Sequence, residues 1–280
     1  MRYSYSNLPY AGETLERSFS RVARCGYDAI ELVADPHALD ASEVIALQRK
    51  YHLPVHALCM VYTAETDLVS SDPAKRQAAE DYVVEMLDRG QRIGIKVLPV
   101  TPTACMKIRP ETDLATERRW ARDAVRRLSV TARRAGIRLV IEPWNRYETY
   151  LINTLVQARE FVSEVGEDNV GIKGDLFHMN IEEADLAEAI RSSGTLLWHM
   201  DAADSNRAAP GHGHIPWLEV LGALVDIKYS GLLNFELLPA EGDPFISLKG
   251  GGAVEFKDLY TEEAIRFLRR QERNVRGVSR

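Results

Sequence analysis

The sequence predicts an α/β fold, a single (β/α)8 (TIM) barrel that occupies residues 1–280 as one domain. First, short apolar runs rich in β-branched residues alternate eight times with amphipathic helical patterns, which is the sequence form of this barrel. Second, no Ser/Gly/Pro-rich linker interrupts the 280 residues, and barrels of about 250 residues fold as one unit. Together these observations favour one barrel over two domains.

Four stretches show the repeating unit most clearly: RVARCGYDAIEL, LDRGQRIGIKVLPV, ARRAGIRLVIEP and VDIKYSGLLNFELLP. In each we expect a glycine to cap a helix and a buried strand to follow. The strands are expected near residues 2–6, 29–32, 54–60, 96–100, 138–142, 170–175, 196–201 and 231–236. The helices are expected near residues 14–25, 41–51, 73–91, 116–135, 154–165, 183–192, 216–227 and 261–271.

Composition excludes several classes of protein. A net charge of −6, without a Lys/Arg stripe, argues against a nucleic-acid partner. Cys25, Cys59 and Cys105 are widely spaced, which fits neither a disulfide framework nor a zinc site. The N-terminus lacks the apolar core of a signal peptide, and no stretch reaches the roughly 18 apolar residues that span a membrane. We therefore expect a cytoplasmic protein without a membrane partner.

Acidic residues end four consecutive predicted strands. They are Glu142, Asp175, Asp201 and Glu236. Barrels of this kind keep their chemistry at these strand ends, and buried carboxylates need a positive partner. A divalent cation such as Mn²⁺ or Mg²⁺, which prefers oxygen ligands, would serve all four. The structural alternative is that these acids cap loop amides or pair with Arg207 and Lys173. Glu31 also ends a strand and is a candidate to line the same pocket.

Several motifs in the second half of the chain resemble one known family. They are EPWNRYE (142–148), GDLFHMNIEE (174–183), ADSNRAAPGHGHIPW (203–217) and YSGLLNFE (229–236). These segments are similar to the xylose isomerase-like sugar isomerase/epimerase superfamily, closest to ketose 3-epimerases of the D-tagatose and D-allulose type. The first half resembles it by pattern alone.

The resemblance implies one divalent ion, with Mn²⁺ favoured and Co²⁺ or Mg²⁺ as alternatives. In the family two glutamates, an aspartate and a histidine hold it, and the first three correspond here to Glu142, Glu236 and Asp175. The histidine position falls on Asp201, which would make the site one unit more negative. His199 lies one inward step deeper on the same strand and is the alternative ligand, but we favour Asp201 because the ion should sit at the strand end.

The resemblance also implies a reaction. A proton beside the ketose carbonyl is removed to give a metal-bound enediolate, and a second carboxyl group returns it from the opposite face. Glu142 and Glu236 take these catalytic roles. Glu148, His178 and Arg207 match residues that bind the substrate.

Alternatives remain open. Glu148 could instead pair with Arg146, Arg207 could neutralise Asp204, and His178 could be a loop histidine with a structural role. A second enzymatic reading is a 3-keto-glycoside lyase, including C-glycoside cleavage, at the same metal site. A third is a sugar-binding barrel without catalysis. In every reading the partner is a small carbohydrate, and the resemblance implies a homo-oligomer, either a dimer or a tetramer.

Overall fold

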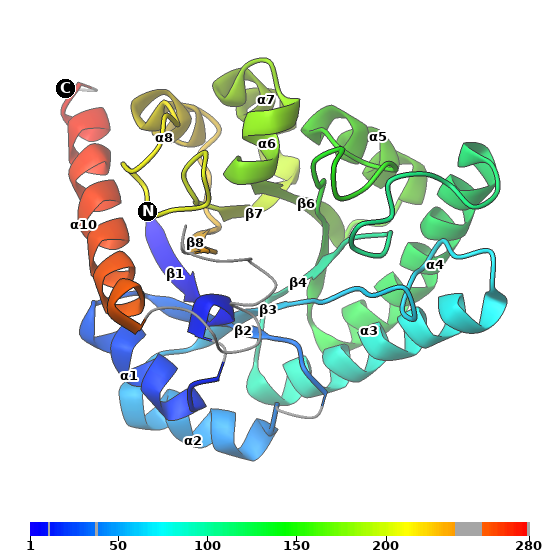
Figure 1. Ribbon diagram of the computed structural model, residues 1–280, viewed down its shortest axis with the longest axis horizontal. Coiled ribbons are helices and arrows are strands. Elements are labelled where there is room, and N and C mark those ends of the chain that lie inside the picture. Colours follow the sequence, from blue (N-terminus) through cyan, green and yellow to red (C-terminus); the bar gives the residue numbers. More distant parts are fainter. Residues whose placement is uncertain (11, 37–38, 239–253, 279–280) are drawn as a thin grey trace.

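The computed structural model describes residues 1–10, 12–36, 39–238 and 254–278, and its strands form one closed parallel barrel in the order β1 to β8 (Figure 1). This confirms the predicted fold. The strands are β1 (Arg2–Ser6), β2 (Ala29–Val33), β3 (Val55–Cys59), β4 (Val97–Val100), β5 (Arg138–Ile141), β6 (Val170–Asp175), β7 (Leu197–Asp201) and β8 (Leu232–Phe235). The last strand, β8, pairs with β1 and closes the barrel.

Helices surround the barrel, and α10 runs beside β1, where the chain begins (Figure 1). The helices are α1 (Leu15–Arg24), α2 (Ala41–Tyr51), α3 (Pro73–Ile93), α4 (Leu114–Ala135), α5 (Leu155–Val165), α6 (Leu176–Glu182), α7 (Leu186–Ser193), α8 (Trp217–Asp226) and α10 (Val254–Val278), with short 3₁₀ turns at Leu8–Tyr10 and Gly194–Leu196. Among these helices none is both long and apolar enough to cross a membrane.

The expected glycine caps are present after α3 and α4, where Gly94 and Gly136 adopt left-handed φ angles of 93° and 68°. The same prediction is wrong for the stretch VDIKYSG. There Lys228 takes the positive φ of 54° after α8, and Gly231 is needed for another reason. A Cβ atom at Gly231 would lie 2.4 Å from the carbonyl oxygen of Trp198, so glycine permits close strand packing at this point.

Two helices differ from their predicted ranges. The helix predicted at residues 183–192 begins at Leu186, and α6 precedes it, directly after β6. Asp175 explains why α6 begins directly after β6. Its side chain accepts a 2.7 Å hydrogen bond from the backbone N–H of Phe177 and so caps α6. The helix predicted at 261–271 is longer in both directions, as α10.

The barrel interior is polar along several strands. Ser4, Glu31, Lys173, His199 and Asn234 are each at most 1% exposed. Because side chains alternate between the two faces of a strand, these residues share the inner face with the acidic strand ends one step further along. The barrel therefore holds a column of polar groups below its mouth.

His56 on β3 provides a test of this polar interior. Its Nε2 atom is buried without a hydrogen-bond partner, and burial lowers the pKa of the imidazole to about 3. Folded His56 stays neutral while the unfolded chain binds a proton below its ordinary pKa, so stability falls as pH drops from about 6.5 towards 3. We predict that His56→Leu reduces the loss of stability between pH 7.5 and pH 5 by about 2 kcal/mol.

Urea unfolding of both proteins at the two pH values measures this difference. His52→Asn, which removes an exposed histidine whose φ is 50°, is the matched control. An equal pH dependence in wild type and His56→Leu would contradict the prediction.

Candidate active site

The structure brings the four predicted acids together at the barrel mouth. Asp175 and Asp201 are the last residues of β6 and β7, and Glu142 and Glu236 directly follow β5 and β8. None of the four is more than 6% exposed. The register pairs Asp175 with Asp201 across neighbouring strands. The parallel strands thus gather four carboxyl groups in one buried cluster.

The spacing of these groups suits a metal ion. Ligand atoms of Asp175, Asp201 and Glu236 all lie within 4.8 Å of one another, and those of Glu142, Asp175 and His178 do so as well. Oxygen ligands of Mg²⁺-sized ions lie about 2.1 Å from the ion, so oxygens up to about 4.2 Å apart can share one. Asp175 belongs to both groups. The spacing of these oxygens is close to the spacing around a divalent cation. The donor set therefore fits a divalent cation with oxygen ligands.

A buried lysine and a half-buried arginine lie among the acids, as the structural alternative anticipated. Lys173 Nζ is 3.0 Å from Glu142 Oε1 and 2.6 Å from Asp201 Oδ2. Arg207 Nη2 is 3.3 Å from Asp175 Oδ2 and 3.1 Å from Glu236 Oε2. The two cations do not balance the cluster, because Glu31 adds a fifth buried carboxyl group. With all groups ionised three negative charges remain, which still favours a divalent cation.

Burial dominates the acidity of the cluster. It raises the pKa of Glu142 well above its usual range and also raises the pKa values of Asp175, Asp201 and Glu236, although the nearby cations oppose the shift. For Lys173 burial lowers the pKa, but Asp201 and Glu142 outweigh it, so the ammonium stays charged. A raised pKa favours the protonated form of a carboxyl group, which makes it easier for that group to take up a proton.

His199 lies one step deeper than Asp201. Its Nε2 atom is 3.6 Å from Glu31 Oε2 and 3.6 Å from Asp201 Oδ1, and the ring is fully buried. Burial lowers the pKa of His199 to about 4, so it is neutral. The ligand atoms that lie within 4.8 Å of one another at Asp175 and Glu236 include one from Asp201 and none from His199. This geometry favours Asp201 as the ligand at the barrel mouth. His199 lies next to Asp201, deeper in the barrel.

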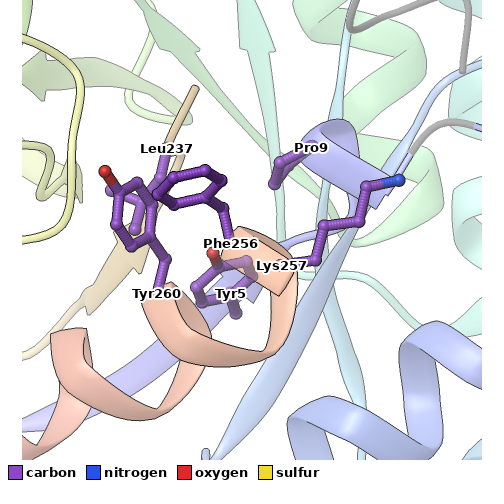
Figure 2. Close-up of a pocket in the computed structure, with 6 residues that line it drawn as sticks. All are labelled: Tyr5, Pro9, Leu237, Phe256, Lys257 and Tyr260. Carbon is purple, nitrogen blue, oxygen red and sulfur yellow. The ribbon is translucent and has the colours of Figure 1, made fainter. Parts of the chain in front are cut away.

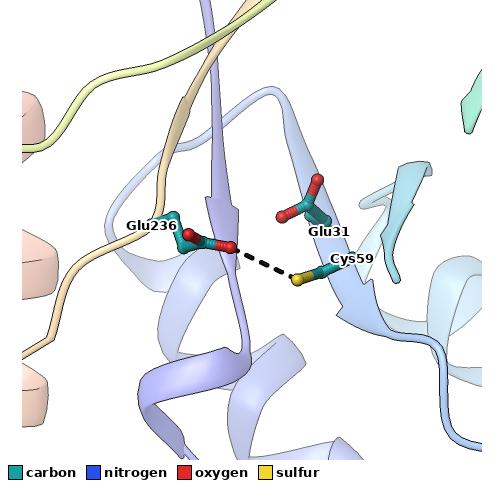
Figure 3. A group of neighbouring side chains, drawn as sticks. All are labelled: Glu31, Cys59 and Glu236. Carbon is teal, nitrogen blue, oxygen red and sulfur yellow. Dashed lines mark hydrogen bonds between the residues drawn. The ribbon is translucent and has the colours of Figure 1, made fainter. Parts of the chain in front are cut away.

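Neutral residues that the sequence analysis did not identify hold the acids in place. Asn234 Nδ2 donates to Asp201 Oδ1 and to Glu31 Oε1, both at 2.9 Å. The thiol of Cys59, at the end of β3, donates to Glu236 Oε1 at 3.2 Å, and Glu31 lies beside this pair (Figure 3). The strand alternation offered a signal, since Asn234 is two residues before Glu236.

The predicted substrate-binding residues border the cluster. The guanidinium of Arg207 pairs with Asp175 and Glu236. The alternative prediction, that it pairs with Asp204, is therefore wrong. His178 lies on α6 and not in a loop, with Nε2 3.6 Å from Asp175 Oδ2. Their substrate roles stay predictions.

Glu148 lies next to His178, with Oε1 4.0 Å from His178 Nδ1. It accepts a 2.9 Å hydrogen bond from Asn145 Nδ2. The alternative pairing of Glu148 with Arg146 is wrong, because Arg146 pairs with Glu182 at 2.7 Å. Glu148 therefore keeps a carboxylate at the edge of the cluster.

A second, mainly apolar pocket lies between β1, the chain after β8 and the start of α10 (Figure 2). Its lining residues are Tyr5, Pro9, Leu237, Phe256, Lys257 and Tyr260. None of them belongs to the carboxylate cluster. The described residues that line this pocket therefore offer no carboxyl group to a divalent cation.

A parallel α/β barrel with an acidic mouth defines a class of enzymes that act at the carboxyl ends of the strands. Residues 19–271 match the family described as xylose isomerase-like TIM barrel, and the chain belongs to this family. The resemblance stated from the sequence motifs is thereby confirmed.

Several relatives of the chain are epimerases, which are isomerases. D-psicose 3-epimerase of Ruminiclostridium cellulolyticum is 32% identical over 235 residues, covering 82% of this chain and 78% of the relative. The 3-dehydro-D-guloside 4-epimerase of Escherichia coli is 29% identical, covering 84% and 92%. The solved structure of L-ribulose 3-epimerase superposes with a TM-score of 0.90 at 25% identity, covering 99% of this chain and 96% of that one.

The loop that carries Arg207 is built around Asp204, which is fully buried. Oδ1 accepts hydrogen bonds from the N–H groups of Ser205 and Ile215, and Oδ2 accepts from Gly211 N–H and Trp217 Nε1. Burial raises the pKa of Asp204, but these hydrogen bonds outweigh it and lower the pKa below its usual value. The carboxylate thus organises the loop.

We predict that Asp204→Asn lowers the free energy of unfolding by about 2–4 kcal/mol, because one oxygen that accepts a buried and a partly buried N–H donor becomes an NH₂ group. Urea unfolding measures the loss. Asp226→Asn, at an exposed aspartate paired with Arg191, is the control. If both variants were equally stable, Asp204 would not organise the loop.

Proposed function

We propose that this chain is a sugar epimerase of the ketose 3-epimerase type, which inverts a carbon beside a carbonyl group by moving a proton. The observation that carries the proposal is the pair of buried glutamates after β5 and β8, whose pKa values are raised and which share one cluster. The epimerase relatives support the same class of reaction. The substrate is accordingly a small ketose or a related keto sugar.

A divalent ion, with Mn²⁺ favoured over Co²⁺ or Mg²⁺, would be held by Asp175, Asp201 and Glu236 together with Glu142. When bound, such an ion supplies a Lewis acid that makes the C–H bond beside the carbonyl more acidic. The spacing of the carboxylate oxygens supports this ligand set. Carboxylates favour a hard cation over one that prefers thiolates.

The protein side chains then move the proton. Glu142 and Glu236 follow strands that are separated by β6 and β7 in the closed barrel, so they approach a substrate from different sides. One carboxylate removes the proton, and the other, as the carboxylic acid, returns a proton to the opposite face of the same carbon. Glu148, His178 and Arg207 would orient the sugar hydroxyls around that carbon.

A second candidate is supported by the relative from Escherichia coli, whose name denotes an epimerase of a 3-dehydro glycoside. Proton removal beside a ketone at C3 of a glycoside can expel the group one carbon further on. The alternative function is therefore a 3-keto-glycoside lyase, including C-glycoside cleavage, that uses the same two glutamates.

We propose further that the protein assembles as a dimer or tetramer. We also propose that it is located in the cytoplasm. Two neighbouring loops, linked by a bridge between Lys107 and Thr149, expose Met106 (56%), Ile108 (50%) and Tyr147 (67%). An exposed apolar patch of this kind supports an interface between subunits. The three cysteines are free, which suits a reducing compartment. Light scattering of the purified protein measures the oligomeric state.

The substrate experiment uses free ketoses, 3-keto-glycosides and their phosphates in deuterated water with Mn²⁺. Deuterium at a carbon beside the carbonyl, with inversion there, would support the epimerase. Release of the aglycone with an unsaturated keto sugar would instead identify the lyase. Absence of deuterium from every sugar, despite bound Mn²⁺, would contradict both.

We predict that Glu142→Gln and Glu236→Gln each reduce turnover by about 10²–10⁴-fold or more, because an amide cannot exchange the proton. The deuterium assay measures the loss, and circular dichroism checks the fold. Glu164→Gln, at a surface glutamate paired with Arg118, should keep full activity. Normal turnover in either cluster variant would refute the two-glutamate scheme.

A further inference from the structure

Lys173 is a lysine inside a barrel. It lies on β6, is 1% exposed, and is aligned with His199 on β7. One step further along the same two strands, Asp175 is aligned with Asp201. A lysine ammonium loses much hydration energy at such a depth, so it persists there only with close anionic partners.

The partners of the two cations divide the acidic cluster into halves. Lys173 lies at 3.0 Å and 2.6 Å from carboxylate oxygens of Glu142 and Asp201, while Arg207 contacts Asp175 and Glu236. The Asp201 carboxylate is also held from its other oxygen by Asn234. Asp201 is therefore fixed by a cation on one side and by a neutral donor on the other.

Asp201 and Lys173 together add no net charge to the cluster. Without Lys173, the carboxylates of Glu142 and Asp201 would lie in a buried site without their ammonium partner, and the cluster would be one unit more negative. Without the charge of Asp201, the ammonium would keep Glu142 alone and the cluster would be one unit less negative. Each residue thus compensates for the other.

We propose that Lys173 is a positioning residue that forms a charge-balanced pair with Asp201 and thereby sets how strongly the cluster binds a divalent cation. The part that concerns the cation rests on the proposed function. The ammonium orients Asp201 and Glu142 and offsets one negative charge, so a cation meets a smaller net charge than the carboxylates alone would give. The net charge of the pair, to which each residue contributes one unit of opposite sign, sets the affinity.

The test compares four full-length proteins: wild type, Lys173→Met, Asp201→Asn and the double variant. Asparagine retains an oxygen ligand but removes the charge. Isothermal titration with Mn²⁺ should give an affinity about tenfold or more tighter for Lys173→Met and about tenfold or more weaker for Asp201→Asn. The double variant, whose cluster charge equals that of wild type, should return to within about threefold of wild type.

Thermal unfolding without divalent ions provides an independent readout. Lys173→Met should lower the melting temperature, and adding Asp201→Asn should restore part of the loss, because fewer unpaired carboxylates remain buried. Lys107→Met is the matched control, since it removes a lysine paired with Asp67 outside the cluster. In that variant the Mn²⁺ affinity should stay at the wild-type value.

Two results would overturn the proposal. If Lys173→Met lowered the melting temperature by the same amount with aspartate or with asparagine at position 201, Lys173 would act through packing alone and not through a pair with Asp201. If the four proteins bound Mn²⁺ with equal affinity, the pair would not tune the site. Failure of all four to bind Mn²⁺ would instead refute the proposed cofactor, and the melting temperatures would then decide whether the pair exists.

Discussion

The site depends on one electrostatic constraint: five carboxyl groups are buried at or just below the mouth of the barrel with two cationic side chains. Burial alone would drive protons onto these acids, and Lys173 and Arg207 oppose it, each paired with two of them. The remaining negative charge is what makes the cluster receptive to a cation. The same burial raises the pKa values of the carboxyl groups, which favours their protonated forms.

The scaffold meets this constraint through strand register. Acids at equivalent ends of β6 and β7 lie side by side, and inward residues one step below them supply the lysine and a histidine. Asn234 then ties the acid of β7 to Glu31 of β2 across the interior. Hydrogen bonds and ion pairs thus connect strands that are distant in sequence.

Much of this arrangement could be predicted from sequence, because period-two alternation and strand ends identify inward acids. Glu142, Asp175, Asp201 and Glu236 were found in that way. Asn234 and Cys59 were not, since a neutral residue in an apolar run looks like ordinary core. The helix α6 was missed because Asp175 both ends a strand and caps a helix. Sequence could name Lys173 and Arg207 as partners of the acids, but only coordinates could assign each cation to its pair.

Four of the five acids in the cluster come from β5 to β8, while β1 to β3 add Glu31 and the supporting groups Ser4 and Cys59. The two glutamates proposed to move the proton are therefore encoded in the second half of the gene. Loops after the early strands carry neither glutamate, so substitutions in those loops leave both in place. An exchange of the N-terminal half between relatives would have to preserve Glu31 and Cys59, because these side chains contact Asn234 and Glu236 of the other half.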